Sequence, residues 1–149
     1  MKFGGKFTSY LTFSRNCEEA FALYKSVFGG EYVFLIRYGD LPSEFVLDEP
    51  ERNLIMHVEL SLGESGSMYG VDLLPSGGRV IPGNNMAIMV TLPSREEFHR
   101  VFQALSPEGT VIREPQRTSW SELFTHFSDK FGIQWVVNLE EPIIKDSDS

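Results

Sequence analysis

The chain has 149 residues, of which 42% are hydrophobic and 23% charged, so it can bury a core and disorder is not expected. Its formal net charge of −8 argues against nucleic acid or an anionic membrane as partner, because both require a basic face. No apolar run approaches the roughly 20 residues of a membrane helix. The single cysteine excludes an internal disulfide and a multi-cysteine metal site. Residues 1–6 lack the apolar stretch of a secretory signal, so we expect a cytoplasmic protein.

The first half of the chain predicts one strand, one helix and then three strands. Residues 7–13 form the first predicted strand, and Asn16 is the expected N-cap of a helix with Glu19 at the capping-box position. The helix is expected to end at Gly29-Gly30. Its expected apolar face is Ala20, Leu23, Tyr24, Val27 and Phe28. Strands are then predicted at 31–38, 54–62 and 67–73.

The strand at 54–62 has the clearest alternation in the sequence. Met56, Val58 and Leu60 face one way, whereas His57 and Glu59 face the other. The acidic segment 39–53 before it is expected to be a long loop that acts as a solvated lid. It lacks the glycine-anchored spacing of a calcium loop.

The second half repeats this order. A strand at 86–92 leads into a helix capped by Ser94, with Glu97 three residues on and an apolar face of Phe98, Val101, Phe102 and Leu105. Strands follow at 110–114, 123–128 and 133–139. Such self-similarity predicts an α+β domain, residues 1–149, made of two β-α-β-β-β modules at 6–74 and 85–140. Paired modules leave a cleft, and clefts bind small molecules.

Several fragments, in the right order, resemble one family over nearly the whole chain. They are Tyr10-Leu11-Thr12-Phe13, Asn16-Cys17-Glu18-Glu19-Ala20, Val27-Phe28-Gly29-Gly30-Glu31, Ile55-Met56-His57-Val58, Thr118-Ser119-Trp120 and Asp129-Lys130-Phe131-Gly132-Ile133-Gln134-Trp135. Together they resemble the PhnB-like branch of the glyoxalase/bleomycin-resistance/dioxygenase superfamily, also called vicinal oxygen chelate. The resemblance implies an eight-stranded, open, barrel-like cleft and a homodimer. It also implies either a divalent metal in the cleft or ligand binding without catalysis.

Some PhnB-like proteins carry a ubiquinone-pathway methyltransferase label. The sequence does not support that label here, because no strand runs into a glycine-rich turn and helix suited to a methyl-donor nucleoside.

The resemblance places the four metal-ligand positions at about Thr8, Glu59 (or His57), Asn85 and Val136. Only the strand of His57 and Glu59 supplies strong ligands, because threonine and asparagine are weak donors and valine cannot coordinate. A register shift of two residues would bring Asn138 to the last position, which adds only an amide. We therefore expect no tightly bound metal and no other cofactor, although a weak divalent site stays possible.

The residues expected to contact a ligand are those that alternation points into the cleft, together with one exposed tryptophan: Thr8, Tyr10, Asn85, Met89, Val136 and Trp120. His57 and Glu59 allow two interpretations. In one they form a catalytic or ligand-binding pair in which Glu59 raises the pKa of His57. In the other they are a polar pair satisfied inside the fold.

Other titratable and aromatic residues favour structural roles. Cys17 in the first helical turn is expected to be a small buried thiol and not a nucleophile. Trp135 alternates with the core residues, and His99 lies on a polar helix face. His126 is left undecided between the cleft and solvent.

Two classes of function follow. The missing metal ligands favour a protein that binds a small, partly apolar molecule. The alternative is a lyase, isomerase or dioxygenase that uses His57 and Glu59 with a weak or atypical divalent metal.

Overall fold

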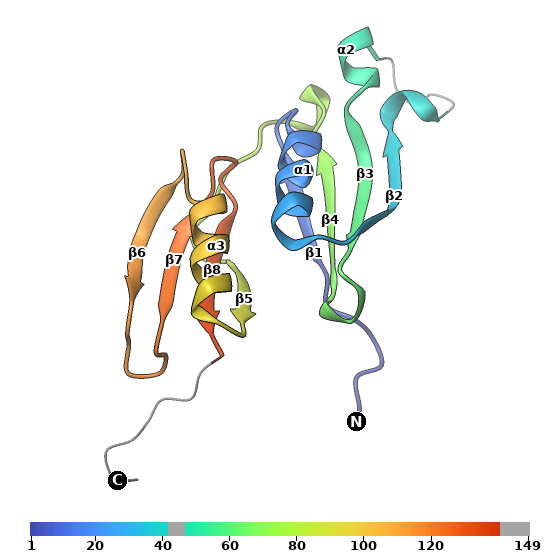
Figure 1. Cartoon of the computed structure of the whole chain (residues 1–149). Coiled ribbons are helices and arrows are strands. Elements are labelled where there is room, and N and C mark those ends of the chain that lie inside the picture. Colours follow the sequence, from blue (N-terminus) through green and yellow to red (C-terminus); the bar gives the residue numbers. More distant parts are fainter. Residues whose placement is uncertain (42–46, 141–149) are drawn as a thin grey trace, which may run out of the picture. The chain divides into compact units, whose positions relative to one another are not determined.

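The structure, a computed structural model, describes residues 1–41 and 47–140. The chain divides into two compact units, Met1–Ile81 (unit 1) and Pro82–Ser149 (unit 2). Each unit has its own open four-stranded sheet and one long helix (Figure 1). The expected α+β class and the two-module construction are therefore confirmed. None of the described helices combines the length and the apolar character needed to span a bilayer.

Unit 1 has the predicted order of elements. These are β1 (Ser9–Phe13), α1 (Cys17–Phe28), β2 (Glu31–Arg37), β3 (Ile55–Ser61) and β4 (Ser67–Asp72). The strand order in the sheet is β1-β4-β3-β2, and the β1–β4 pair is parallel while the other pairs are antiparallel. Among the described residues, the short helical segments η1 (Tyr38–Asp40) and α2 (Glu49–Arg52) lie between β2 and β3, η2 (Gly63–Ser65) lies between β3 and β4, and η3 (Pro75–Gly77) follows β4.

Unit 2 repeats the same topology. Its elements are β5 (Ile88–Leu92), α3 (Arg95–Leu105), β6 (Thr110–Gln116), β7 (Phe124–Ser128) and β8 (Gln134–Leu139). The strand order is β5-β8-β7-β6, again with one parallel pair, β5–β8, at the corresponding place. The repeat seen in the sequence is thus a repeat of fold.

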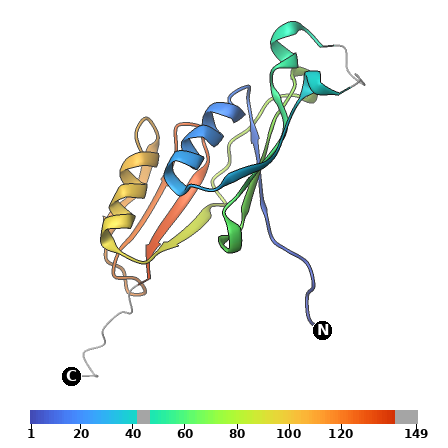
Figure 2. The ribbon, with the colours of Figure 1, turned by 45° about the vertical axis from the view of Figure 1, so that its right-hand side comes forward.

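In each unit the helix covers one face of the sheet (Figures 1 and 2). In unit 1, a Cβ placed on Gly70 of β4 would lie 2.8 Å from Phe21 Cζ and 3.0 Å from Cys17 Sγ, both on α1. In unit 2, the ring of Phe102 on α3 contacts Phe127 on β7, with centroids 5.6 Å apart. We name this side of each sheet its helix face and the other side its open face.

The two helices begin differently, which corrects one expectation. Ser94 caps α3 as predicted, because its Oγ accepts the amide hydrogen of Glu97 at 3.1 Å. The Asn16 side chain makes no capping hydrogen bond. The amide of Cys17 instead donates to the buried Asp72 Oδ1 at 2.9 Å, from a strand 55 residues away in the sequence. A tertiary contact has replaced the local cap.

Strand boundaries and one alternation also differ from the predictions. β1 begins at Ser9 and β5 at Ile88, so Thr8 and Asn85 precede the strands and are exposed. Met56 was expected on the same side as Val58 and Leu60, but Ile55 is the buried residue at the start of β3, where the β2–β3 register shifts between Ile36 and Arg37. The predicted long loop 39–53 contains the end of η1 and all of α2, and residues 42–46 lie outside the described part.

Candidate ligand-binding site

One row of side chains crosses the whole open face of unit 1. Tyr10 on β1 pairs with Tyr69 on β4, Tyr69 pairs with Glu59 on β3, and Glu59 pairs with Phe34 on β2. Paired residues of neighbouring strands point to the same side of a sheet. Tyr69 lies between Gly70 and the buried Met68, whose side of β4 faces α1, so the row faces away from α1. We name these four residues row 1.

His57 lies on the open face of unit 1, next to row 1. Its ring meets the rings of Phe34 and Tyr69 edge-on, with both centroid distances 5.3 Å. Glu59 pairs across the sheet with Tyr69 on β4, and His57 lies on the same face two residues along β3. Hydrogen bonding to Glu59, followed by desolvation, raises the pKa of Tyr69. Glu59 and His57 are both half-buried and adjoin aromatic rings.

The corresponding row of unit 2 has different chemistry. Met89 on β5 pairs with Val136 on β8, Val136 pairs with His126 on β7, and His126 pairs with Arg113 on β6. We name these residues row 2. Tyr10 lies three residues before Phe13, the last paired residue of β1, and Met89 lies three residues before Leu92, the last paired residue of β5. The two rows are therefore equivalent in register. The position of His126, which the sequence left undecided, is therefore on the open face.

The side chain of Gln134 orients the ring of His126. Gln134 Nε2 donates to the Gly83 carbonyl at 2.8 Å, so its Oε1 is the atom that lies 2.8 Å from His126 Nε2. An amide oxygen only accepts, which makes Nε2 the protonated nitrogen of a neutral His126. Nδ1 is then the nitrogen left to accept a proton or a hydrogen bond.

The exposed tryptophan lies beside a second row of unit 2. Phe124 pairs with Asn138, which pairs with Thr91. The ring of Trp120, which is 61% exposed, packs edge-on against Phe124 with centroids 5.8 Å apart. Ser121 Oγ donates to Asn138 Oδ1. Trp120 therefore lies beside the open face of unit 2, where the sequence predicted a ligand contact.

Family comparisons agree with this fold. The model of the Glyoxalase/Bleomycin resistance protein/Dioxygenase superfamily matches residues 6–137. The chain belongs to this superfamily. Protein YjdN of Escherichia coli (strain K12) is 29% identical over 139 residues, which span 87% of this chain and 92% of YjdN.

Two solved structures are similar over nearly their whole length. The crystal structure of PA1353 from Pseudomonas aeruginosa is 31% identical, with a TM-score of 0.81, over 92% of this chain and 98% of that one. The PhnB protein from Bacillus cereus is 26% identical, with a TM-score of 0.73, over 91% of this chain and 99% of that one. The PhnB-like resemblance of the sequence is confirmed.

The donor set of this superfamily member does not fit a tightly bound divalent ion. Of the four positions inferred from the resemblance, Thr8 and Asn85 lie outside the strands, and Val136 is apolar. The two units also do not contribute equivalent positions to this set. Glu59 lies on β3, whereas the residue of unit 1 that corresponds in register to Val136 is Tyr69 on β4. Within residues 1–41 and 47–140, no three His, Cys, Asp or Glu side chains are grouped as a metal site would require.

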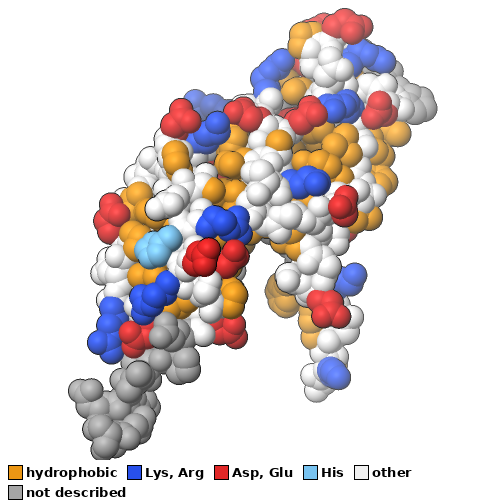
Figure 3. Space-filling view, in the orientation of Figure 1, with side chains coloured by type: hydrophobic (Ala, Val, Ile, Leu, Met, Phe, Trp, Pro, Cys, Tyr) orange, Lys and Arg blue, Asp and Glu red, His pale blue; other side chains and the backbone are white. Residues whose placement is uncertain are grey.

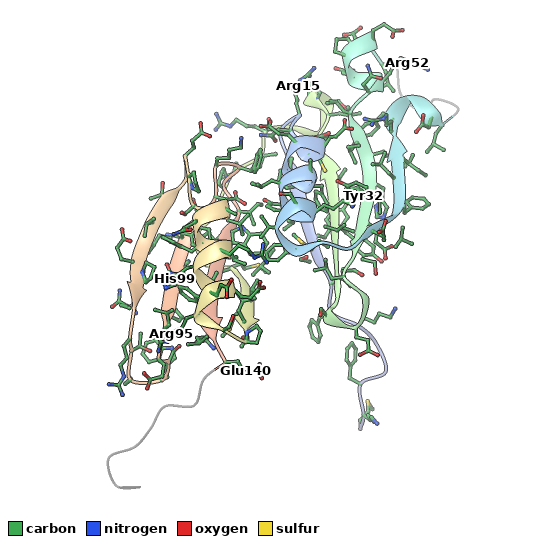
Figure 4. All side chains as sticks on the ribbon, viewed as in Figure 1. Arg15, Tyr32, Arg52, Arg95, His99 and Glu140 are labelled. Atoms are coloured by element: carbon green, nitrogen blue, oxygen red, sulfur yellow. The ribbon has the colours of Figure 1, made fainter. Side chains whose placement is uncertain are left out.

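Three other residues that the sequence analysis considered lie outside both rows. Cys17 is fully buried, and burial, followed by the charges of Asp72 and Glu18, raises the pKa of its thiol far above the ordinary value, which makes it a poor nucleophile. Trp135 is 1% exposed and donates through Nε1 to Asp129 Oδ2 at 2.9 Å. His99 is on the exposed side of α3, as Figure 4 shows.

Sequence reasoning missed three members of the rows. Tyr69, Phe34 and Arg113 were not singled out, although alternation in the strand 67–73 is enough to place Tyr69 on one face. The β2–β3 ladder shifts register between Tyr32 and Phe34, and the β6–β7 ladder shifts on both sides of Arg113. Simple alternation fails across such irregularities.

Proposed function

We propose that this protein binds a small, partly apolar molecule on the open face of its sheets without a tightly bound divalent metal. The observation that supports the proposal is row 1 with its neighbour His57. Tyr10 is 59% and Phe34 is 44% exposed, on a face that the helix of the unit does not cover. Exposed aromatic rings around a few polar groups are typical of small-molecule sites. The poor donor set described above argues against a metal.

A thermal-shift screen of chelator-treated protein tests this proposal. Small aromatic molecules are expected to raise Tm, whereas zinc, nickel or manganese alone are not. The Tyr10→Ala variant should lose the response to those molecules. The matched control is Tyr32→Ala. Tyr32, labelled in Figure 4, lies on β2 of the same sheet but on the helix face, where it pairs with the buried Leu60 and lies near Lys25 of α1. A stoichiometric sub-micromolar metal site would contradict the proposal.

The second candidate function is that of a lyase, isomerase or dioxygenase. The contacts of His57 with two rings, two residues from Glu59, favour it, since an oriented imidazole is suited to moving protons. Substitution of His57 by Ala separates the candidates. Lost turnover with retained binding would indicate catalysis, and lost binding alone would indicate a ligand contact.

We also infer that the protein is a homodimer that uses neither nucleic acid nor a membrane. The dimer follows from the superfamily, and the other two statements follow from the net charge of −8. Light scattering of the purified protein, with a monomer mass of 16.9 kDa, tests the dimer.

A further inference from the structure

We propose that the open face of unit 1 selects an organic cation: an aromatic molecule with a quaternary or protonated amine. This inference rests on the proposed function and names the chemical class of its ligand. It depends on two features of row 1, which are a carboxylate without a cationic partner and aromatic rings beside that carboxylate.

Glu59 is the carboxylate in question. Among the residues that the structure describes, ion pairs join Arg37 to Glu18, Arg100 to Glu97 and Arg117 to Glu122, and none includes Glu59. Its neighbour across the sheet on β4 is the neutral Tyr69. A half-buried carboxylate is stabilised by a nearby positive charge, because opposite charges attract more strongly where burial limits screening by water.

No lysine or arginine of the described strands of unit 1 lies on this face. Its positions, from the strand register, are Tyr10, Thr12, Glu31, Phe34, Ile36, His57, Glu59, Ser61, Ser67, Tyr69 and Val71. Arg37 turns instead to Glu18 on α1, and the Lys25 ammonium lies 5.9 Å from the centroid of Tyr32. Glu31 and Glu59 therefore give the face negative charge, and no cationic side chain of the strands on that face neutralises it.

The rings supply the second feature. The faces of Tyr and Phe rings attract cations, and exposed rings of this kind surround quaternary ammonium groups in many binding sites. Tyr10 and Phe34 are the two most exposed members of row 1, and His57 meets Phe34 and Tyr69 edge-on. Charge and ring surface together match an ammonium group on an aromatic body better than either an anion or a neutral molecule.

Row 2 provides an internal contrast. At the register positions of Glu59 and Phe34 it has His126 and Arg113, so the carboxylate is replaced by an imidazole and the phenyl ring by a cation. An organic cation gains no charge partner there. The preference for a cation is therefore confined to unit 1.

The test uses three naphthalene probes that share one ring system and differ in charge. They are (2-naphthylmethyl)trimethylammonium, 2-naphthalenemethanol and 2-naphthoate, titrated into the full chain by NMR with chelator present. We expect the cation to bind at least about tenfold more tightly than the alcohol and the anion to bind most weakly. Glu59→Gln, which removes the charge and keeps the size of the side chain, should reduce the cation preference to about twofold or less.

The matched control is Glu64→Gln, which removes the same charge from the exposed turn η2. This control should leave the preference unchanged. If the alcohol or the anion binds row 1 as tightly as the cation, the cation inference is overturned while the proposed function stands. If no probe shifts the resonances of row 1, the proposed function itself fails. If Glu59→Gln and Glu64→Gln reduce the preference equally, the overall charge and not Glu59 selects the cation, which also overturns the inference.

Discussion

Unit 1 and unit 2 share topology and register, yet they differ at equivalent positions on both faces of the sheet. On the helix face, Gly70 and Asp72 of β4 correspond to Val137 and Leu139 of β8. On the open face, the aromatic and acidic row 1 corresponds to row 2, which contains His126 and Arg113. The duplicated fold thus tolerates different packing under its helices, and its open faces are free to acquire different ligand chemistry.

The largest expected effect comes from Asp72, which unit 2 replaces by leucine. Asp72 is 1% exposed, and its carboxylate accepts the amides of Cys17 and Ile55, each at 2.9 Å. Substitution by Leu leaves buried amides without acceptors and should cost about 3 kcal/mol or more of unfolding free energy. Urea denaturation measures this cost. Asp72→Asn, which retains one acceptor, should lose less.

That comparison fails if Asp72→Leu is nearly as stable as the parent protein. Such a result would mean that apolar packing alone is enough to dock α1 on its sheet.

The next effect concerns the close approach of α1 to its sheet at Gly70. A methyl group there would press on the Phe21 ring and on Cys17 Sγ at 3.0 Å. Gly70→Ala should therefore cost about 2 kcal/mol, because overpacking displaces the helix. Phe21→Leu should recover part of that loss in the double variant. Strictly additive losses by thermal denaturation would show that the helix and Gly70 are not coupled.

Loss of the helix N-cap side chain should have a smaller effect, and here unit 2 should lose more stability than unit 1. Ser94→Ala should cost about 1 kcal/mol, since Ser94 Oγ caps α3. Asn16→Ala should cost less than about 0.5 kcal/mol, because Asp72 already accepts the first amide of α1. Equal losses in urea denaturation would contradict the assignment of a tertiary cap to unit 1.

The smallest effect is the ion pair of Glu18 with Arg37, which joins α1 to β2 at 2.8 Å. The Arg37 hydrogen bond lowers the pKa of Glu18, so the folded state binds that proton less tightly than the unfolded state. The pair therefore stabilises above the ordinary glutamate pKa, and its contribution is lost as pH falls through the lowered pKa. Because the pair is largely exposed, Glu18→Gln should cost only about 0.5 kcal/mol near neutral pH. A loss that persists unchanged in acid would contradict this origin.

Much of the fold could be predicted because it depends on local patterns. Alternation, the Ser94 cap and the Gly29-Gly30 helix end, where both glycines have positive φ, are encoded within a few residues. The predicted apolar faces of the two helices agree closely with the residues that are buried, although Phe21 is also buried and was not predicted. Asp72 could not be foreseen, because its partners Cys17 and Ile55 are 55 and 17 residues away.

The candidate site was predicted only in part. Tyr10, His57, Glu59, Met89 and Val136 were singled out, and they lie on the open faces as alternation requires. Their neighbours across the sheet depend on the pairing register, which a single sequence does not specify. The pairing of Glu59 with Tyr69 is such a case, because alternation alone placed Glu59 beside His57.

The proposal of metal-independent binding on the open face is tested most directly by one NMR titration of chelator-treated protein with (2-naphthylmethyl)trimethylammonium. Binding is expected to shift the ring resonances of Tyr10, Phe34 and Tyr69 and to leave those of Tyr32 in place. Shifts that appear only after a divalent metal is added, or that leave row 1 unchanged with this cation and with 2-naphthalenemethanol alike, would contradict the account.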